Sequence, residues 1–286
     1  MGKPRPGKIA VVTDSTADIP ADLARAYGIH VMPQILIMGS EVWRDGVDID
    51  PPAFYQLLRS SRHFPSTSQA SSTAFQQLFE ELARTATGIV AVLISSKLSG
   101  TINSAQAAAA SLSDIPIAIV DSQAASMMLG FAALAAAEVA AAGGDLATVS
   151  GAAQARIDRT GVYFVVDTLD YLHRGGRIGA AAKLFGSALN LKPVLEIRDG
   201  IVTPVAKIRS GRRALDKVHE LLAAQIAPGA RVHMAVLHVA APEEASRFRQ
   251  ELEARFHPVE MLLAECGPVI GTHTGPGTVG VAFYTE

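Results

Sequence analysis

Short apolar runs rich in valine and isoleucine recur through the first half of the chain, separated by stretches with helical periodicity. The runs are IAVVT at 9–13, IHVMPQILI at 29–37, GIVAVLI at 88–94 and IPIAIV at 115–120. Strands that alternate with helices are typical of a parallel sheet whose two faces are covered by helices. The pattern therefore predicts an α/β fold that begins with a mainly parallel sheet flanked by helices.

The second half shows a different order of elements. The segment LKPVLEIRDGIVTPVAKIR at 191–209 is expected to form a hairpin that turns at Asp199-Gly200, because Asp-Gly between two β-rich runs favours a two-residue turn. A helix, the strand RVHMAVLHV at 231–239, a second helix and two closing strands are expected to follow. This order predicts a C-terminal α+β domain.

The change of pattern near Thr160 divides the chain into an N-terminal domain at 1–160 and a C-terminal domain at 161–286. The length of 286 residues and the hydrophobic content of 49% are sufficient for one large core or two smaller ones. Neither a Pro/Ser-rich linker nor an internal repeat marks the boundary, which therefore depends on the change of pattern.

The charge balance argues against a nucleic-acid-binding protein. Lys and Arg number 25 against 27 Asp and Glu, so the net charge is only -2 and no basic footprint is expected. A single cysteine, Cys266, excludes an internal disulfide framework. It favours a reducing compartment, so we expect the protein in the cytoplasm.

The sequence predicts neither export nor a membrane anchor. The first residues, MGKPRPGKIA, contain no apolar signal region, and Pro6 stands where an N-myristoylation signal has Ser or Thr. The alanine-rich segment at 124–142 contains Gly130 and Glu138 and is weakly hydrophobic on insertion scales. We expect it to be a buried helix, without stable insertion into a membrane.

Stretches rich in hydroxyl groups stand next to the predicted strands. DSTADIP at 14–20 follows the first strand, and SSKLSGT at 95–101 follows the strand at 88–94 and opens a helix. A third, STSQASS at 66–72, precedes a helix that starts near Ala74. The same residue types cap helices, which would explain any one of the three. Because open α/β sheets bind ligands at the carboxyl ends of their strands, their joint occurrence favours one shared site.

The segment GTHTGPG at 271–277 places His273 between two threonines in a predicted loop. Gly275 to Gly280 matches the pattern G-x-G-x-x-G, but a dinucleotide fingerprint needs a following helix and an acidic residue about 20 positions on. The chain also has no Walker A, HExxH, CxxC or EF-hand pattern. We expect neither a nucleotide nor a metal, and no cofactor.

An enzymatic alternative remains at this point. A serine hydrolase or acyl transferase could use Ser99 as nucleophile and His273 as base. However, Lys97-Leu98-Ser99-Gly100 lacks the first glycine of the G-x-S-x-G nucleophile elbow.

Taken in order, the motifs resemble those of the DegV family of bacterial fatty-acid-binding proteins, some of which are the lipid-carrying subunit of fatty acid kinase. The resemblance covers nearly the whole chain. Its motifs are VTDSTADIP (12–20), WRDGVDI (43–49), STSQ (66–69), ISSKLSGTINSA (94–105), Asp121-Ser122, YLHRGGRIG (171–179), LNLKPVLEIRDGIVTPVAKIR (189–209) and GPVIGTHTGPG (267–277). Each motif alone is weak, but their order and spacing are specific.

The resemblance implies one long-chain fatty acid, of the palmitate or oleate class, buried between the two domains. Its carboxylate would be bound by Thr67, Ser99 and His273, and its tail would lie in an apolar tunnel. Arg177 and Arg209 match basic positions near the head group or on a kinase-facing surface. The chain would itself be non-catalytic, and a separate ATP-dependent fatty acid kinase would phosphorylate the presented carboxylate.

Two departures from the family pattern are visible. Ala70 stands where the family often has proline after TSQ, and His173 lies in a stretch that is usually richer in Lys or Arg. Neither changes the residues expected at the head group; both lie where the resemblance implies a docking surface.

Overall fold

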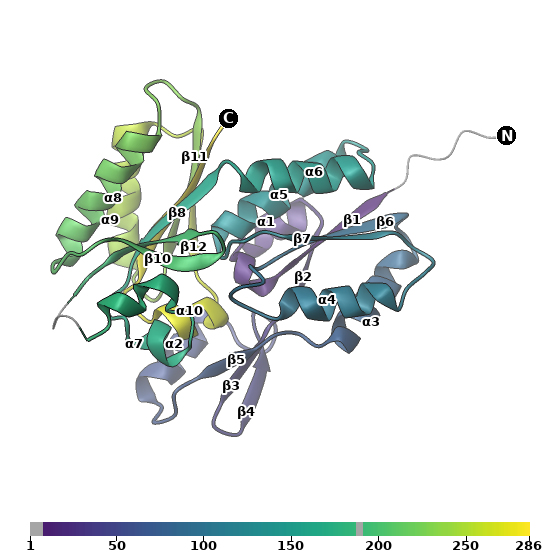
Figure 1. The fold of residues 1–286 in the computed structure, drawn as a ribbon, viewed down its shortest axis with the longest axis horizontal. Coiled ribbons are helices and arrows are strands. Elements are labelled where there is room, and N and C mark those ends of the chain that lie inside the picture. The colour runs from purple at the N-terminus through teal and green to yellow at the C-terminus, as the bar shows by residue number, and fades with distance from the viewer. Residues whose placement is uncertain (1–7, 187–190) are drawn as a thin grey trace.

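A computed structural model describes residues 8–186 and 191–286; the segment 1–7, for which neither export nor anchoring is expected, and residues 189 and 190 of the hairpin motif lie outside these ranges. The N-terminal half contains a four-stranded, fully parallel sheet (Figure 1). Its order is β2-β1-β6-β7, with β1 at Ile9–Asp14, β2 at Ile29–Met32, β6 at Gly88–Leu93 and β7 at Ile117–Asp121. The predicted parallel sheet is thus confirmed.

Helices cover both faces of this sheet, as the alternating pattern predicts. One face packs against α1 (Ala21–Ala26), α5 (Met127–Ala141) and α6 (Leu146–Ile157), and the other against α3 (Ser72–Ala83) and α4 (Thr101–Ala110). All six residues of β6 are buried, because its side chains alternate between two apolar layers. The buried helix predicted at 124–142 is confirmed as α5. Within the described ranges, none of the helices has the length and apolar character needed to cross a membrane.

The apolar run at 29–37 forms two strands rather than one. Its first part is β2, whereas its second part begins β3 (Ile35–Met38), which belongs to a separate antiparallel sheet with β4 (Glu41–Arg44) and β5 (Ser66–Ser68). Pro33 lies at the break and has no backbone N–H for a sheet ladder. The chain therefore leaves the parallel sheet at Pro33 and Gln34.

The C-terminal half contains a six-stranded sheet in the order β10-β9-β8-β13-β11-β12. All neighbours are antiparallel except β11 and β12, and α8 (Gly211–Gln225) and α9 (Pro242–Phe256) cover one face. The strands are β8 (Thr160–Val165), β9 (Val194–Arg198), β10 (Ile201–Ala206), β11 (Val232–His238), β12 (Glu260–Glu265) and β13 (Val279–Thr285). The hairpin turn at Asp199-Gly200 is confirmed, with positive φ angles of 51° and 78°.

The connecting elements correct one expectation. They are η1 (Ser15–Ala17), α2 (Pro51–Ser60), α7 (Asp170–Arg174), η2 (Gly179–Leu184) and α10 (Pro268–Thr274). His273 therefore lies in the last turn of α10, not in a loop. Pro268 starts this helix and Gly275, with φ of 80°, ends it. The hydroxyls of Thr272 and Thr274, which flank His273, donate within the helix to the carbonyls of Pro268 and Ile270.

The two halves pack closely. The largest hydrophobic core cluster includes Val92 of the parallel sheet, Phe131 of α5, and Phe164 and Tyr284 of the six-stranded sheet. The division into domains at residue 160 stays a prediction, since the strands separate there while this core continues across both sheets.

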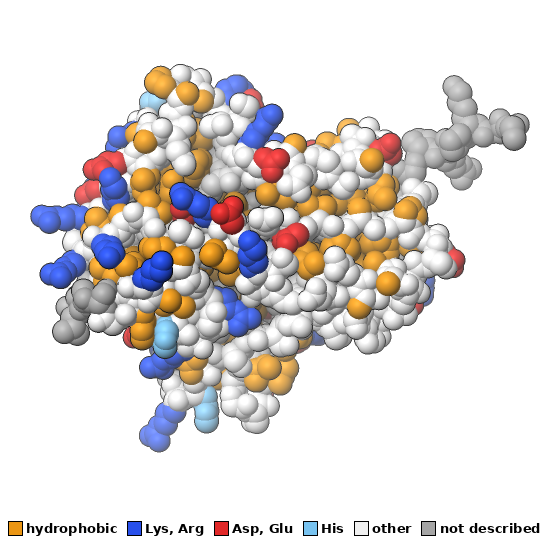
Figure 2. All heavy atoms as spheres, viewed as in Figure 1, with side chains coloured by type: hydrophobic (Ala, Val, Ile, Leu, Met, Phe, Trp, Pro, Cys, Tyr) orange, Lys and Arg blue, Asp and Glu red, His pale blue; other side chains and the backbone are white. Residues whose placement is uncertain are grey.

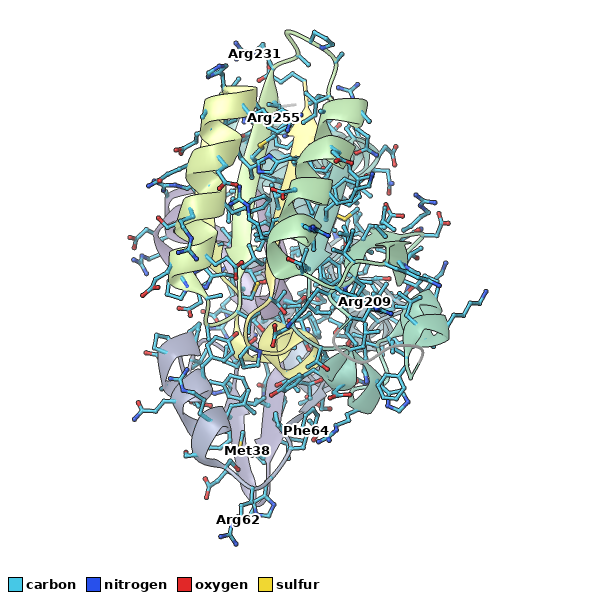
Figure 3. All side chains as sticks on the ribbon, turned by 90° about the vertical axis from the view of Figure 1, so that its left-hand side faces the viewer. Met38, Arg62, Phe64, Arg209, Arg231 and Arg255 are labelled. Carbon is cyan, nitrogen blue, oxygen red and sulfur yellow. The ribbon has the colours of Figure 1, made fainter. Side chains whose placement is uncertain are left out.

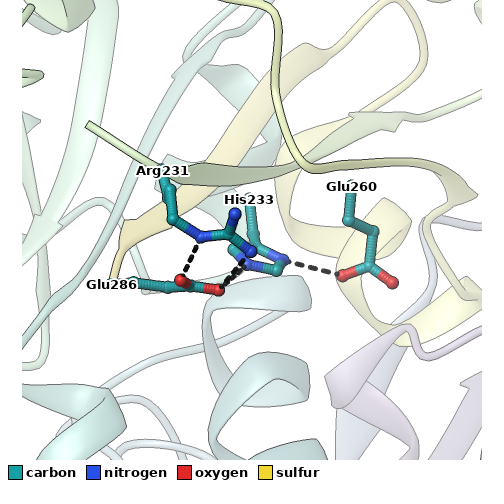
Figure 4. Close-up of polar contacts among 4 residues, drawn as sticks. All are labelled: Arg231, His233, Glu260 and Glu286. Atoms are coloured by element: carbon teal, nitrogen blue, oxygen red, sulfur yellow. Dashed lines mark hydrogen bonds and ion pairs between the residues drawn. The ribbon is translucent and has the colours of Figure 1, made fainter. Parts of the chain in front are cut away.

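A polar cluster lies where β11 and β12 begin and β13 ends (Figure 4). His233 lies between two carboxylates, with its Nε2 2.9 Å from Glu286 and its Nδ1 3.3 Å from Glu260. Arg231 also pairs with Glu286, and Arg231 and His233 lower the pKa of that exposed carboxyl group to about 2. The cluster connects the ends of β11, β12 and β13 on the side of the sheet opposite the site described next.

Candidate functional site

A large cavity opens at the carboxyl ends of β1 and β6, the two adjacent strands at which the strand order reverses. From β1 the chain passes to β2 on one side, whereas β6 lies on the other side, and ligands of open α/β sheets bind at such a switch point. The cavity encloses about 930 Å³ of unfilled space, including the part that opens to solvent. Both halves contribute apolar walls, among them Ile94, Leu98, Phe164, Leu172, Val202 and Leu237.

The three hydroxyl-rich stretches meet at this cavity. Thr16, Thr67 and Ser99 each line it. A Cβ atom at Gly100 would lie 2.9 Å from Nε2 of Gln69, so the segments around Thr67 and Ser99 are in direct contact. Thr16 is already used in the fold, because its hydroxyl and backbone N–H both donate to the buried carboxylate of Asp14. In these three stretches, Thr67 and Ser99 are therefore the half-buried hydroxyls that remain for a ligand, beside the exposed Ser68, which also lines the cavity.

Thr67 and His273 form a direct pair, with 2.8 Å between Thr67 Oγ1 and His273 Nε2. Burial, with a smaller contribution from the charge of Arg177, lowers the pKa of His273 to about 4, so the ring is neutral at pH 7. Its other nitrogen, Nδ1, is buried and has no hydrogen-bond partner among the described residues. Since a buried N–H without an acceptor is rare, we assign the hydrogen to Nε2. His273 then donates to Thr67, and the Thr67 hydroxyl keeps its own hydrogen for the cavity.

Close backbone contacts fix the position of α10. A Cβ atom at Gly175, just after α7, would lie 2.2 Å from Nδ1 of His273, so only glycine leaves room for the ring. On the other side, the buried Tyr55 of α2 packs against Gly271 and donates its hydroxyl to the carbonyl of Cys266 over 2.6 Å. The imidazole is therefore held directly by the backbone at Gly175 and indirectly by Tyr55, which packs against the backbone of α10.

The geometry does not support the hydrolase alternative. Ser99 Oγ lies 2.8 Å from Thr101 Oγ1, while His273 contacts Thr67. A serine triad needs a hydrogen bond from nucleophile to base and a third group that orients the base. Within the described parts of the chain, Ser99 and His273 share no hydrogen bond, and nothing accepts from or donates to Nδ1 of His273.

The two predicted arginines lie in different places. Arg177 lines the cavity and donates from Nε to the carbonyl of Leu98 over 3.0 Å and from Nη1 to that of Gly175 over 2.7 Å. Arg209 is exposed between β10 and α8 and does not line the cavity. Figure 3 shows it midway along the molecule, between Arg231 near one end and Arg62 at the other.

The turn of the β9–β10 hairpin also contacts the segment that carries Ser99. Ser95 Oγ donates to the carbonyl of Gly200 over 2.8 Å, and Lys97 Nζ donates to that of Asp199 over 2.7 Å. Together with Arg177, these contacts fix the 95–99 segment from the C-terminal half. The site is therefore assembled by both halves of the chain.

Comparison with known proteins assigns this architecture to a family. The model of the DegV family, described as uncharacterised, matches residues 8–286. A DegV domain-containing protein of Streptomyces coelicolor is 42% identical over 280 residues, which cover 97% of this chain and 99% of the relative. The chain belongs to the DegV family.

Solved DegV structures share its fold. A DegV family protein from Thermus thermophilus, described as binding a fatty acid, superposes with a TM-score of 0.92 at 36% identity, covering 98% of this chain and 100% of the other. DegV of Bacillus subtilis, described as a fatty acid binding protein, also gives a TM-score of 0.92, at 33% identity with the same coverage. The family and fold expected from the motifs are thereby confirmed.

The sequence pointed to neither Gln34 nor Ser126, although both line the cavity of this DegV chain. Gln34 is hidden within an apolar run. Ser126 carries a positive φ of 53° and donates to Asp18, which also accepts the backbone N–H of Gly267 at the start of α10. Burial raises the pKa of Asp18 to about 7, with a smaller contribution from nearby Asp45. The sequence feature that could have led to Ser126 is the hydroxyl-rich stretch around its partner Asp18.

Proposed function

We propose that this chain binds one long-chain fatty acid, of the palmitate or oleate class, in the cavity between its two halves. Thr67 and Ser99 donate to the carboxylate, His273 orients Thr67, and the tail follows the apolar walls. The observation that carries the proposal is a mainly apolar cavity at a switch point, lined by the half-buried hydroxyls of Thr67 and Ser99. The fatty acid binding described for the Thermus thermophilus and Bacillus subtilis proteins supports it.

The energetics divide the work between tail and head group. Burying about a dozen methylenes at ~0.8 kcal/mol each gives on the order of 10 kcal/mol, of which association costs remove a large part. A carboxylate that leaves water needs partners, and each hydrogen bond to a charged group contributes about 1.5–3 kcal/mol. The tail therefore sets affinity, while Thr67 and Ser99 set orientation and offset the cost of desolvation.

We further propose that the chain is a non-catalytic subunit that presents the carboxylate to an ATP-dependent fatty acid kinase in the cytoplasm. Arg177 borders the head-group end of the cavity, and exposed Arg209 faces the partner. Figure 2 shows Lys and Arg side chains gathered over the half of this face that carries the C-terminal sheet and helices. The free thiol of the buried Cys266 agrees with a reducing compartment.

Native mass spectrometry of the purified protein tests the binding proposal. We expect one fatty acid per chain, or uptake of one added palmitate or oleate. Ser99→Ala should weaken palmitate binding by about 1.5–3 kcal/mol. The exposed Ser113→Ala serves as the matched control. A protein that purifies without lipid and refuses both fatty acids would contradict the proposal.

Presentation is tested separately with palmitate-loaded protein, ATP and a fatty acid kinase, trapping acyl phosphate with hydroxylamine. His273→Ala should reduce acyl-phosphate formation more than it reduces palmitate binding, because the tail still holds a misoriented carboxylate. Equal turnover by the wild type and the variant would show that His273 only stabilises α10.

A further inference from the structure

Gln34 lies between β2 and β3, is 2% exposed, and connects all three hydroxyl-rich stretches. Its backbone N–H donates to Ser15 Oγ over 3.1 Å. Its side-chain Oε1 accepts the backbone N–H of Ala70 over 3.0 Å, and its Nε2 donates to Thr101 Oγ1 over 3.0 Å. Through its backbone N–H and its side-chain amide, one buried residue thus joins the segments that follow β1, β5 and β6.

These contacts fix which way the amide points. The backbone N–H of Ala70 can only donate, so the oxygen of the Gln34 amide must face it. The nitrogen then faces Thr101. The same side chain is among the hydrogen-bond donors that oppose the rise in the pKa of Asp14 caused by burial, which agrees with this orientation.

The orientation of the Gln34 amide also fixes the direction of the hydrogen bond between Thr101 and Ser99. Thr101 is fully buried, and its hydroxyl already accepts from Gln34. A hydroxyl has one hydrogen to donate, and in the described part of the chain the one acceptor bonded to Thr101 Oγ1 is Ser99 Oγ, at 2.8 Å. The backbone N–H of Thr101 also points to Ser99 Oγ, at 3.4 Å. Ser99 therefore accepts from Thr101, and its own hydrogen is left for the cavity that it lines.

We propose that Gln34 is a positioning residue that orients a hydrogen-bond chain from the Ala70 N–H through Thr101 to Ser99, so that Ser99 meets the ligand as a donor. The proposal rests on the fatty-acid-binding function proposed above. Its consequence is specificity. A carboxylate, which only accepts, matches Ser99 and Thr67, whereas an alcohol head group donates or accepts equally well and gains nothing from the fixed direction.

The test compares palmitate with hexadecan-1-ol, which has the same chain length, by calorimetry. In Gln34→Met, which removes the donor to Thr101 without adding charge, the Thr101–Ser99 pair takes either direction. We expect palmitate affinity to fall about two- to tenfold while hexadecanol affinity stays within about twofold. Thermal unfolding of each variant confirms that it is folded, and a merely structural defect would weaken both ligands alike.

Variants of Thr101 keep the test informative if Gln34→Met folds poorly. Thr101→Val should lower the preference for palmitate as Gln34→Met does, while Thr101→Ser should keep the wild-type preference. In the double variant, the two losses should not add, because both break the same chain. Additive losses, or an unchanged preference in both single variants, would overturn the role of Gln34. Failure of the wild-type protein to bind palmitate would instead overturn the proposed function.

Discussion

At the scale of single residues, the site depends on the direction of hydrogen bonds more than on charge. His273 is neutral because burial lowers its pKa to about 4, so it serves Thr67 as a fixed donor rather than as a cation. Two hydroxyls, each with a hydrogen left for the cavity, then suit an acceptor such as a carboxylate. Among the described residues that line the cavity, the charged side chain is Arg177, which donates to the carbonyls of Leu98 and Gly175.

Substitutions at Thr67 test whether its hydroxyl donates to the carboxylate. Thr67→Val keeps the shape of the side chain and removes its donor, so palmitate binding should weaken by about 1.5–3 kcal/mol, roughly tenfold to a hundredfold. Thr67→Ser keeps the hydroxyl and should bind nearly as tightly as the wild type. Calorimetry with palmitate measures both variants. Equal affinity of the valine variant and the wild type would exclude Thr67 from the head-group site.

A second prediction concerns protonation of His273. In the ligand-free protein its ring should titrate near pH 4, whereas a carboxylate bound beside it favours the charged ring and should raise this pKa. By linkage, binding of the palmitate carboxylate and proton uptake by His273 then favour each other at pH values at which the fatty acid stays ionised. NMR titration of the ring with and without palmitate measures the shift. The same pKa in both states would place the carboxylate away from His273.

At the scale of elements, α7 and α10 must approach closely for the imidazole to reach Thr67. Gly175 makes this approach possible because its Cα stands against His273, and Gly271 does the same for Tyr55 on the other side. The seven-residue helix α10, ended by Gly275 with its positive φ, therefore fixes the position of the His273 imidazole.

Gly175→Ala tests this packing. Its added Cβ would lie 2.2 Å from Nδ1 of His273 and 3.1 Å from the carbonyl of Tyr171, so α10 must move and palmitate affinity should fall severalfold. The control is Gly151→Ala in α6, where nothing lies within 4 Å of the new atom and the helix should gain stability. Palmitate titrations of both variants measure the effect. Unaltered binding by Gly175→Ala would show that palmitate affinity does not depend on the position of α10.

Features that depend on residues close together in the sequence could be predicted, whereas features that depend on distant residues could not. The strands predicted at 9–13, 88–94 and 115–120 and the turn at Asp199-Gly200 leave local patterns, and these predictions are confirmed, whereas the run at 29–37 breaks into two strands. The α10 helix was missed because its glycine-rich sequence resembles a loop, and its stability depends on Tyr55, more than 200 residues away. Gln34 was missed for the same reason, since its partners Ala70 and Thr101 are 36 and 67 residues distant. The motifs pointed to Thr67 and Ser99, but only the structure shows that each hydroxyl has a hydrogen left to donate to a ligand.

At the scale of the whole molecule, buried carboxyl groups make stability depend on pH. Burial raises the pKa of Asp18 and Asp45 to about 7, so the folded protein holds protons that the unfolded chain releases. Their contribution is complete below about pH 4 and is lost as pH rises through about 7. His273 acts in the opposite sense, because its lowered pKa gives a contribution that is lost as pH falls through about 4.

Asp18→Asn separates these effects. Asparagine tolerates the left-handed conformation at this position, where φ is 51°, and its amide can still bond Ser126 and the Gly267 N–H. The free energy of unfolding of the variant, relative to the wild type, should rise between pH 4 and pH 7, because the variant has no proton to lose there. Urea unfolding at several pH values measures this difference, with exposed Asp114→Asn as control. A difference that is flat across this range would assign the pH dependence to other groups.

The position of β13 has a consequence for synthesis. This strand follows every other described strand in sequence, yet it lies in the middle of the six-stranded sheet, between β8 and β11. While the ribosome is still making it, β8 and β11 have no shared neighbour, and the parts of α5 and α9 that pack against β13 stay uncovered. Until β13 emerges, a nascent chain of this design therefore exposes two unpaired strand edges, which favour aggregation however stable the finished fold is.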